Sequence, residues 1–231
     1  MRLDPDGAQL FPAAFAPDQI SALENALAAL PGNLPGTRLN PPRNGEGDQP
    51  KADGGVGGLG DLVQPATAIA ASILGPETRP VRAVLFDKGP ARNWSLGWHQ
   101  DRTIAVRERI HAPGFTDWTV KQGVAHAVPP FDILERMLTA RIHLDPVGPD
   151  NAPLLIVPGS HRLGRIAEPR IADVATRLGC AACLADRGDL WLYATPILHS
   201  SGRAARPARR RVLQLLYSAD PLPAGLAWLG I

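Results

Sequence analysis

The chain has 231 residues, of which 45% are hydrophobic and 20% are charged, and it contains 24 prolines and 23 glycines. This composition supports a substantial buried core and excludes a chain that is disordered throughout, while the prolines and glycines predict frequent turns and short loops. The 24 basic and 22 acidic side chains leave a net charge of +2, too small a surplus to indicate a nucleic-acid or membrane surface, so we expect neither partner.

Targeting and redox features are few. No run approaches the roughly 18 apolar residues of a membrane span, and the segment from Met1 to Asp6 lacks the apolar centre of a secretion signal, so we expect a cytoplasmic protein. Only Cys180 and Cys183 occur, which excludes a disulfide-built scaffold. Their C-x-x-C spacing fits a redox pair or half a zinc site, but the favoured interpretation is two small residues leading into a strand.

Two helices are predicted in the N-terminal third. Pro17 and Asp18 suit a first turn, and one apolar stripe follows until Pro31-Gly32. A second apolar stripe runs from Leu62 to Leu74. Between them, residues 41–60 are rich in glycine and proline and predict a loop, because the glycine cluster lacks the preceding strand and the following G-K-[ST] of a phosphate-binding loop.

After the second helix the chain changes to short apolar or alternating runs bounded by glycine, proline and aspartate. These runs predict strands at Val81–Phe86, Leu138–Leu144, Leu154–Val157, Leu190–Tyr193 and Val212–Tyr217. Because no long helix separates most of them, we expect an antiparallel sandwich or barrel. We expect one domain over residues 1–231, with a helical and loop part (1–75) packed on a β core (81–218). The segment from Arg102 to Pro130 is predicted to be a long loop of the kind that covers a site.

Three residues in two distant segments suggest a metal centre. In an extended His99-Gln100-Asp101 segment, His99 and Asp101 point to one face and Gln100 to the other. His199 follows a predicted strand, and antiparallel folding can bring it to the same place. Two histidines and one carboxylate form the facial triad that holds non-haem Fe(II) while leaving other metal positions open.

A cluster of arginines follows His199. In the run from Arg210 to Tyr217, Arg210 shares a mixed face with Val212 and Gln214, whereas the other face is nearly all apolar. The mixed face suits a cavity, so Arg210 is our candidate for binding a carboxylate, and Ser201 can donate to the same group. A dicarboxylate such as 2-oxoglutarate needs such a site. The same arginines also fit a phosphate-binding patch, but no interleaved aromatic residues indicate a nucleic-acid groove.

The sequence resembles the phytanoyl-CoA dioxygenase-like Fe(II)/2-oxoglutarate oxygenases, most strongly over Val81–Ser218. The motifs that carry the resemblance are Phe86-Asp87-Lys88, Asn93-Trp94, Trp98-His99-Gln100-Asp101, Asp150-Asn151, Pro158-Gly159-Ser160-His161, Gly188-Asp189 and His199-Ser200-Ser201-Gly202. In that family an H-x-D motif and a distal H-x-S-G are followed by an arginine eleven residues after the distal histidine. Arg210 stands at that distance from His199.

The resemblance implies a mainly β fold, a double-stranded β-helix (jelly roll, cupin-like) with flanking N-terminal helices. It implies His99, Asp101 and His199 on iron, and Arg210 and Ser201 on the distal carboxylate of 2-oxoglutarate. Arg141 stands about where relatives place another co-substrate contact, often an aromatic residue. Asn151-Ala152-Pro153 departs from the Asn-Gly that is common in relatives, which we expect to change a turn rather than the chemistry.

The implied reaction uses O2, releases succinate and CO2, and hydroxylates a small molecule, since halogenating relatives typically lack the carboxylate that Asp101 supplies here. Three residues are candidates for substrate contact. Thr139 shares the polar face of its strand with Arg141, Trp118 lies in the predicted loop, and Lys88 could meet an anionic substrate. Trp118 fits a packing anchor equally well, and Lys88 a solvated strand end.

Three other functions remain open at this point. A jelly-roll module could hold metal or ligand without catalysis, a cupin-like enzyme could use zinc or manganese, and a nucleic-acid oxygenase would share the fold. The near-neutral charge disfavours the last. Substrate identity and oligomeric state are not encoded in any recognisable motif.

Overall fold

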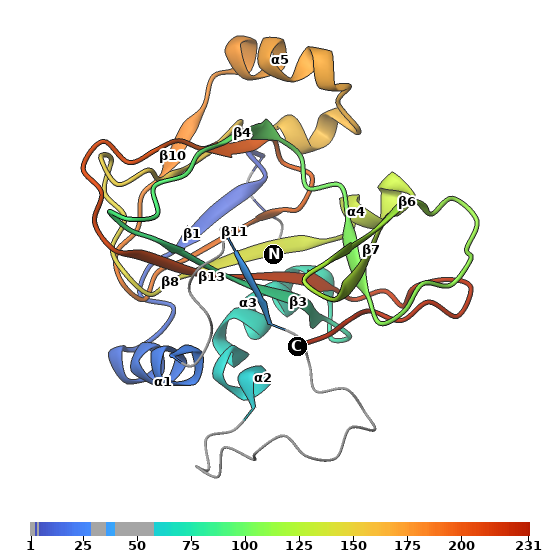
Figure 1. Ribbon diagram of the computed structural model, residues 1–231, viewed down its shortest axis with the longest axis horizontal. Coiled ribbons are helices and arrows are strands. Elements are labelled where there is room, and N and C mark those ends of the chain that lie inside the picture. The colour runs from blue at the N-terminus through green and yellow to red at the C-terminus, as the bar shows by residue number, and fades with distance from the viewer. Residues whose placement is uncertain (1–2, 4, 29–35, 40–57) are drawn as a thin grey trace.

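The computed structural model describes residues 3, 5–28, 36–39 and 58–231, and most of its strands lie in two antiparallel sheets that face each other (Figure 1). The larger sheet has the order β1 (Ala8–Phe11), β11 (Leu190–Ala194), β8 (Leu138–His143), β13 (Arg210–Ser218), β3 (Arg79–Lys88) and β2 (Thr37–Leu39). The smaller sheet has the order β10 (Ala181–Cys183), β9 (Leu154–Ile156), β12 (His199–Ser201) and β4 (Leu96–His99). The expected mainly β, double-stranded β-helix is confirmed.

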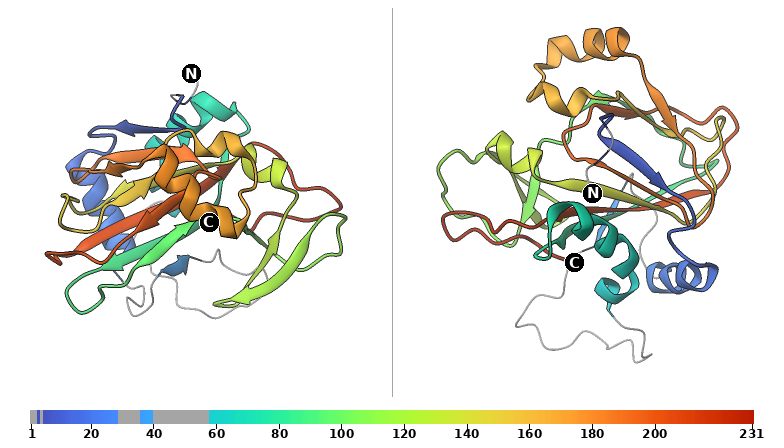
Figure 2. Two further views of the ribbon diagram at one scale, coloured as in Figure 1. Left: turned by 90° about the horizontal axis from the view of Figure 1, so that it is seen from above. Right: turned by 180° about the vertical axis from the view of Figure 1, so that it is seen from behind.

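Helices cover the outer faces of both sheets (Figures 1 and 2). Helices α1 (Pro17–Leu27) and α3 (Gln64–Leu74) pack on the larger sheet, and α5 (Ile171–Leu178) covers the smaller one. Two shorter helices are α2 (Leu59–Leu62) and α4 (Phe131–Glu135), and Ser160–Leu163 and Glu168–Arg170 form 3-10 turns. Among the described residues, no helix has the length and apolar character needed to cross a membrane.

Side-chain alternation gives the larger sheet an apolar outer face and an inner face that carries polar residues on β8. On β13, Leu213 and Leu215 join the core that contains Ile20 and Leu23 of α1. On β8, Leu138, Ala140 and Ile142 join the same core, which leaves Thr139, Arg141 and His143 on the inner face. The main hydrophobic core of the larger sheet therefore lies outside the roll. Inside the roll, Tyr193 of β11 forms a smaller apolar cluster with Leu154 and Ile156 of the smaller sheet, and the inner positions of β8 are left to polar groups.

The predicted helices and the five predicted strands are present, and their ends differ from the predicted ones by at most three residues. Residues 41–57 of the predicted glycine-rich loop lie outside the described residues. The prediction of a long loop from Arg102 to Pro130 is wrong. This segment forms a third sheet with the order β5 (Ile104–Val106), β7 (Val124–Val128) and β6 (Thr116–Lys121), at one end of the roll.

The third sheet forms because its apolar residues find a core of their own. Ile104, Val106 and Ala127 are fully buried in a cluster with Trp228 near the C-terminus. A two-residue turn at Gln122-Gly123, with φ of 52° and 77°, joins β6 to β7, which is the geometry of a tight β-hairpin. The partner for this sheet lies about a hundred residues away in sequence, so local pattern alone could not reveal it.

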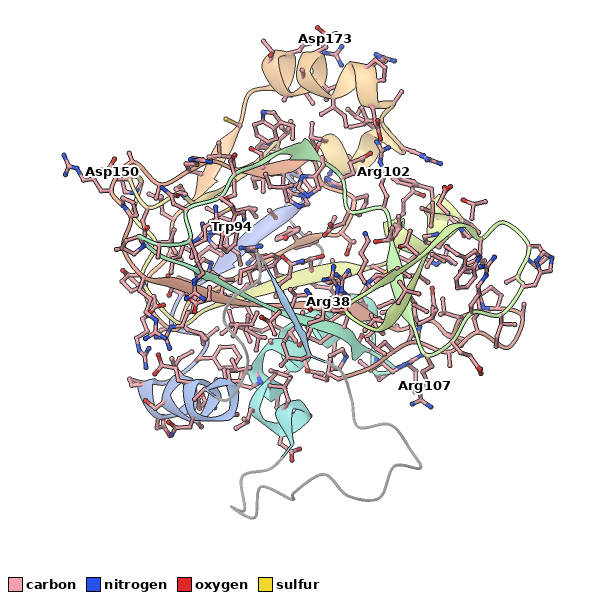
Figure 3. All side chains as sticks on the ribbon, in the orientation of Figure 1. Arg38, Trp94, Arg102, Arg107, Asp150 and Asp173 are labelled. Atoms are coloured by element: carbon pink, nitrogen blue, oxygen red, sulfur yellow. The ribbon has the colours of Figure 1, made fainter. Side chains whose placement is uncertain are left out.

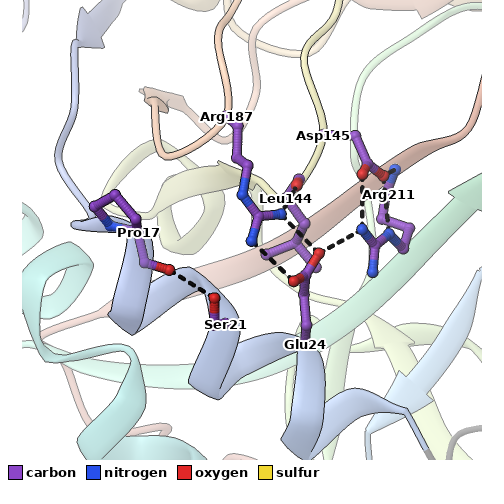
Figure 4. Close-up of polar contacts among 7 residues, drawn as sticks. All are labelled: Pro17, Ser21, Glu24, Leu144, Asp145, Arg187 and Arg211. Carbon is purple, nitrogen blue, oxygen red and sulfur yellow. Dashed lines mark hydrogen bonds and ion pairs between the residues drawn. The ribbon is translucent and has the colours of Figure 1, made fainter.

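An ion-pair network joins α1 to the roll (Figure 4). Arg187 donates two hydrogen bonds to the Glu24 carboxylate, at 2.7 and 2.8 Å, and Arg211 bonds both Glu24 and Asp145. These hydrogen bonds lower the pKa of Glu24 from 4.5 to about 2, and the bond from Arg187 contributes most. Arg211 thus points away from the interior, as its place on β13 predicts.

We expect Glu24→Gln to lower the free energy of unfolding by about 1–2 kcal/mol at neutral pH, because a paired, partly buried carboxylate is lost. Since folding lowers the Glu24 pKa, this stabilisation is present above about pH 4.5 and disappears as the pH falls towards 2. Urea unfolding at pH 7, 5, 3 and 2 should show the difference between the variant and the wild type narrowing at pH 3 and closing only near pH 2. Glu77→Gln, at an exposed position, is the control.

Candidate active site

Strand pairing brings the three predicted metal-binding residues together. β12 pairs with β4 so that His199 lies directly opposite His99, with ring centroids 4.3 Å apart. One potential ligand atom from each of His99, Asp101 and His199 can be chosen so that all lie within 4.8 Å of one another. Two imidazoles and one carboxylate are a donor set that suits a divalent transition metal.

Backbone carbonyls fix the orientation of both imidazoles. Nδ1 of His99 lies 2.8 Å from the carbonyl oxygen of Gly97, and Nδ1 of His199 lies 2.9 Å from that of Ile197. A carbonyl only accepts, so each Nδ1 is the donor, and in the neutral tautomer this leaves the Nε2 lone pair for a metal. Burial lowers the pKa of His199 to about 4, which keeps this ring in the neutral form that a metal requires.

Gln100 anchors the His99-Gln100-Asp101 segment on the face opposite the two candidate metal ligands. Its Nε2 donates to the carbonyls of Gly164 (3.0 Å) and Pro196 (2.8 Å), and its Oε1 accepts from the backbone N–H of Ile166 (2.9 Å). The side chain is 3% exposed. As the sequence predicts, Gln100 points away from His99 and Asp101, and its buried bonds set the backbone that carries them.

A pocket of about 90 Å³ opens from the histidines and Asp101 into the interior of the roll. Its apolar lining includes Phe86, Trp94 and Leu154, and its polar lining includes the following residues: Lys88, Arg141, Ser200, Ser201, Arg210 and Gln214. Arg210 and Gln214 come from the mixed face of β13, as the alternation argument predicts. The larger and the smaller sheet therefore supply opposite walls of one pocket.

The end of the pocket beside Arg210 is strongly basic. Arg210 lies opposite Lys88 in the β13–β3 register, and the Lys88 ammonium donates to Ser201 Oγ (3.1 Å) and to the Gly202 carbonyl (3.0 Å). Arg210 donates to the carbonyl of Ala152. Arg141 donates to Gln214 Oε1 at 2.7 Å. No described residue places a carboxylate in ion-pair distance of these three cations.

Several buried nitrogen atoms at this end have no hydrogen-bond partner among the described residues: Nε of Arg141, Nε of Arg210, and both ring nitrogens of His143. Burial, followed by the charges of Arg210 and Arg141, lowers the pKa of Lys88 to about 7. Burial also lowers the pKa of Arg210 to about 9. Buried cations without an ionic partner suit an anionic ligand such as a carboxylate. Its oxygen atoms would replace the hydrogen bonds to water that these cations lose on burial.

Two of the candidate substrate residues lie away from this pocket. Thr139 is fully buried on β8 and bonds Thr195 (Oγ1 to Oγ1, 3.0 Å). Trp118 lies on β6, where it packs against the core of the third sheet and Arg109 stacks on its ring. Lys88, by contrast, lines the pocket and contacts Ser201.

The cysteines take no part in the site. Cys180 is exposed and Cys183 is buried, and neither forms a disulfide. Cys183 lies in β10, and burial raises its pKa to about 12, so it remains a thiol and a poor metal ligand. The favoured interpretation of the C-x-x-C spacing therefore agrees with the structure.

Sequence reasoning overlooked two contributors to the site. The anchoring role of Gln100 requires the carbonyls of Gly164 and Pro196, which are distant in sequence. Gln214 was placed on the correct face, but its bond to Arg141 depends on the β13–β8 register, in which these two residues are direct partners. The available indication is a glutamine within the otherwise apolar run from Val212 to Tyr217.

Comparison with known proteins gives one family and one fold. A family model described as phytanoyl-CoA dioxygenase (PhyH) matches residues 3–212. EctD from S. alaskensis in its apoform is 19% identical, with a TM-score of 0.66 over 99% of this chain and 78% of that one. AviO1 from Streptomyces viridochromogenes Tue57 is 23% identical, with a TM-score of 0.59 over 95% and 91%. No curated protein gives a significant match.

HygX from Streptomyces hygroscopicus, solved with nickel and 2-oxoglutarate, is 16% identical, with a TM-score of 0.58 over 93% of this chain and 83% of that one. At these identities the solved structures establish the fold and leave the substrate open.

We expect Gln100→Ala to lower the free energy of unfolding by about 2–3 kcal/mol, because it leaves two carbonyls and one N–H buried without partners. Metal affinity should fall as well, since the backbone between His99 and Asp101 loses its anchor. Chemical unfolding and metal titration measure the two effects. Gln64→Ala, at an exposed position in α3, should change neither. Unchanged metal affinity in a folded Gln100→Ala protein would contradict the anchoring role.

Proposed function

The chain belongs to the phytanoyl-CoA dioxygenase family, whose model covers most of its length, and on that basis we propose that it hydroxylates a small molecule. Members of this family are 2-oxoglutarate-dependent non-haem iron oxygenases, so the expected enzyme class and the use of Fe(II), 2-oxoglutarate and O2 are confirmed. We propose a small molecule rather than a nucleic acid as the substrate because the net charge is only +2.

One observation carries the proposal: the cluster of His99, Asp101 and His199 opens into a pocket whose far end holds unpaired buried cations. In the proposed site these three residues would hold iron, the histidines through their Nε2 atoms and Asp101 through its carboxylate. When bound, iron and 2-oxoglutarate supply O2 activation, with release of succinate and CO2 and oxidation of a substrate C–H bond. The chain itself binds and orients the co-substrate and the substrate, and it excludes water from the pocket.

The basic end of the pocket is proposed to bind the distal carboxylate of 2-oxoglutarate. Arg210 is the main partner because it is 2% exposed and its Nε is unpaired. Ser201 and Lys88 lie beside it, already bonded to each other. Arg141 adds a third cation on the neighbouring strand, where the ring of Phe86 lies against it. Phe86 and Trp94 keep the walls of the pocket apolar, which strengthens these charged contacts.

Hydroxylation is the proposed outcome because Asp101 completes the set of three protein ligands. A structure of EctD holds 2-oxoglutarate and 5-hydroxyectoine, which is a hydroxylated compound. The fold itself does not restrict the reaction, since similar structures include a carbocyclase, SnoK, and an epimerase, SnoN. The residues of the site, together with product analysis, therefore carry this part of the proposal.

The direct test is an anaerobic titration of metal-free protein with Fe(II) and then 2-oxoglutarate, monitored through the visible charge-transfer band of a chelated 2-keto acid. The band should form in the wild type and be absent in His99→Ala, which lacks one ligand. In Arg210→Ala the Kd for 2-oxoglutarate should rise about 30-fold or more, because a buried charged contact is lost.

Arg209→Ala is the matched control, since Arg209 is the exposed neighbour of Arg210 and should leave the Kd unchanged. If no band forms while zinc or manganese binds tightly, the site belongs to a cupin-like enzyme or a binding protein instead. If the band forms but 2-oxoglutarate turnover yields no hydroxylated compound with any substrate, hydroxylation is the part that fails.

Lys88→Met should have opposite effects on the empty and the loaded protein. Without 2-oxoglutarate, removal of a buried cation next to Arg210 and Arg141 should leave the melting temperature unchanged or higher, because a desolvation and repulsion cost disappears. The stabilisation that added 2-oxoglutarate provides should shrink. Thermal melts with and without 2-oxoglutarate measure both effects, and exposed Lys121→Met is the control. An unchanged response to 2-oxoglutarate would remove Lys88 from the co-substrate site.

A further inference from the structure

Two arginines outside the pocket described above share the inner face of the larger sheet. Arg82 lies on β3 with the same side-chain phase as Val84, Phe86 and Lys88. Arg38 lies on β2 and is the direct partner of Val84. Arg38 and Arg82 are therefore diagonal neighbours on one face, a separation of roughly 7–8 Å between their backbones. In Figure 3 Arg38 lies near the middle of the view, whereas Arg107 extends outwards at the rim.

Neither guanidinium has a partner among the described residues. Nε of Arg38 and Nε of Arg82 are both buried without a hydrogen bond, and no ion pair to either side chain is formed within the described part of the chain. Burial lowers the pKa of both arginines, and the charge of Arg38 lowers that of Arg82 further. Two adjacent, partly desolvated cations are costly unless an anion lies between them.

The β6–β7 hairpin closes this region from the side. Gln122 at its turn accepts from the backbone N–H of Arg38 (3.1 Å) and donates to the Gly36 carbonyl (2.9 Å), which ties the hairpin to β2. His126 on β7 is fully buried and its Nε2 has no partner. Its Nδ1 donates to the Val124 carbonyl, so Nε2 is an acceptor. His126 therefore does not supply the missing negative charge.

This region adjoins the proposed iron site at the end away from Arg210. Arg82 precedes Lys88 by six residues, about 20 Å along the strand, and Phe86 between them lines the pocket. Burial lowers the pKa of Arg82 and, in agreement with this placement, the charge of Asp101 raises it. Asp101 itself is assigned to the metal, so it is not free to neutralise both arginines.

We propose that Arg82 and Arg38 form an anion-binding subsite that recognises a carboxylate or phosphate group on the substrate to be oxidised. This inference rests on the proposed function, because it places the substrate on the Arg82 side of the metal and 2-oxoglutarate on the Arg210 side. It assigns the substrate class as a small organic acid or phosphate ester, with the reacting carbon between the anionic group and the metal.

The test uses protein loaded with Zn(II) and 2-oxoglutarate, so that the Arg210 site is filled and no turnover occurs. Benzoate, phenyl phosphate and the uncharged benzamide are titrated, and binding is measured by saturation-transfer NMR. At least one of the two anions should bind more tightly than benzamide. Its Kd should rise about tenfold or more in Arg82→Gln and in Arg38→Gln, because each removes one charged contact. Arg107→Gln is the control of equal charge.

The outcomes separate the possible failures. Preference for benzoate or for phenyl phosphate identifies the substrate anion. Equal binding of all three probes, or equal losses in the Arg107→Gln control, overturns the subsite. A change in metal affinity in Arg82→Gln with unchanged anion binding also overturns it and makes Arg82 a positioning residue for Asp101. Failure of the proposed function would appear separately, as absence of the Fe(II)–2-oxoglutarate charge-transfer band before any probe is added.

Discussion

The packing of α1 and α3 against the outer face of the larger sheet is the constraint on which the active site depends. Leucine, isoleucine and alanine side chains of β3, β8, β11 and β13 point outwards and are buried by these helices. Because strand residues alternate, the inner positions of the same strands do not have to be apolar. Arg141, His143 and Arg210 can therefore point into the interior. In a sheet with a hydrophobic core on both faces, these positions would have to be apolar.

Each of the two sheets supplies a different part of the site. The smaller sheet brings His99 and His199 face to face through one cross-strand pair, although a hundred residues separate them. The larger sheet supplies a row of cations along β3 and β13, with Lys88 and Arg210 at one end and Arg82 near the other. A metal bound between these two cationic regions, as proposed, would suit a reaction in which co-substrate and substrate both carry negative charge.

Alternation and motif spacing predicted much of this arrangement. The mixed face of the run from Arg210 to Tyr217 placed Arg210 correctly, and the His99-Gln100-Asp101 triplet placed Gln100 behind the site. The same reasoning applied to Val81–Phe86 would have placed Arg82 inside. Arg38 could not have been found, since its three-residue strand is defined by pairing with β3 rather than by any local pattern. The third sheet was missed for the same reason, because its core includes Trp228 from the far end of the chain.

The position of β4 gives the proposed metal a second consequence. Among the described strands β4 has one neighbour, β12, and their register shifts between His199 and Ser201. A metal bound by both His99 and His199 would link β4 to β12 as a cross-link does. Loss of iron would therefore first loosen β4 at the edge of the sheet and leave the rest of the protein folded. An opened edge strand is open to proteases and to pairing with other chains. Iron supply would in this way influence how long the protein persists, as well as how fast it works.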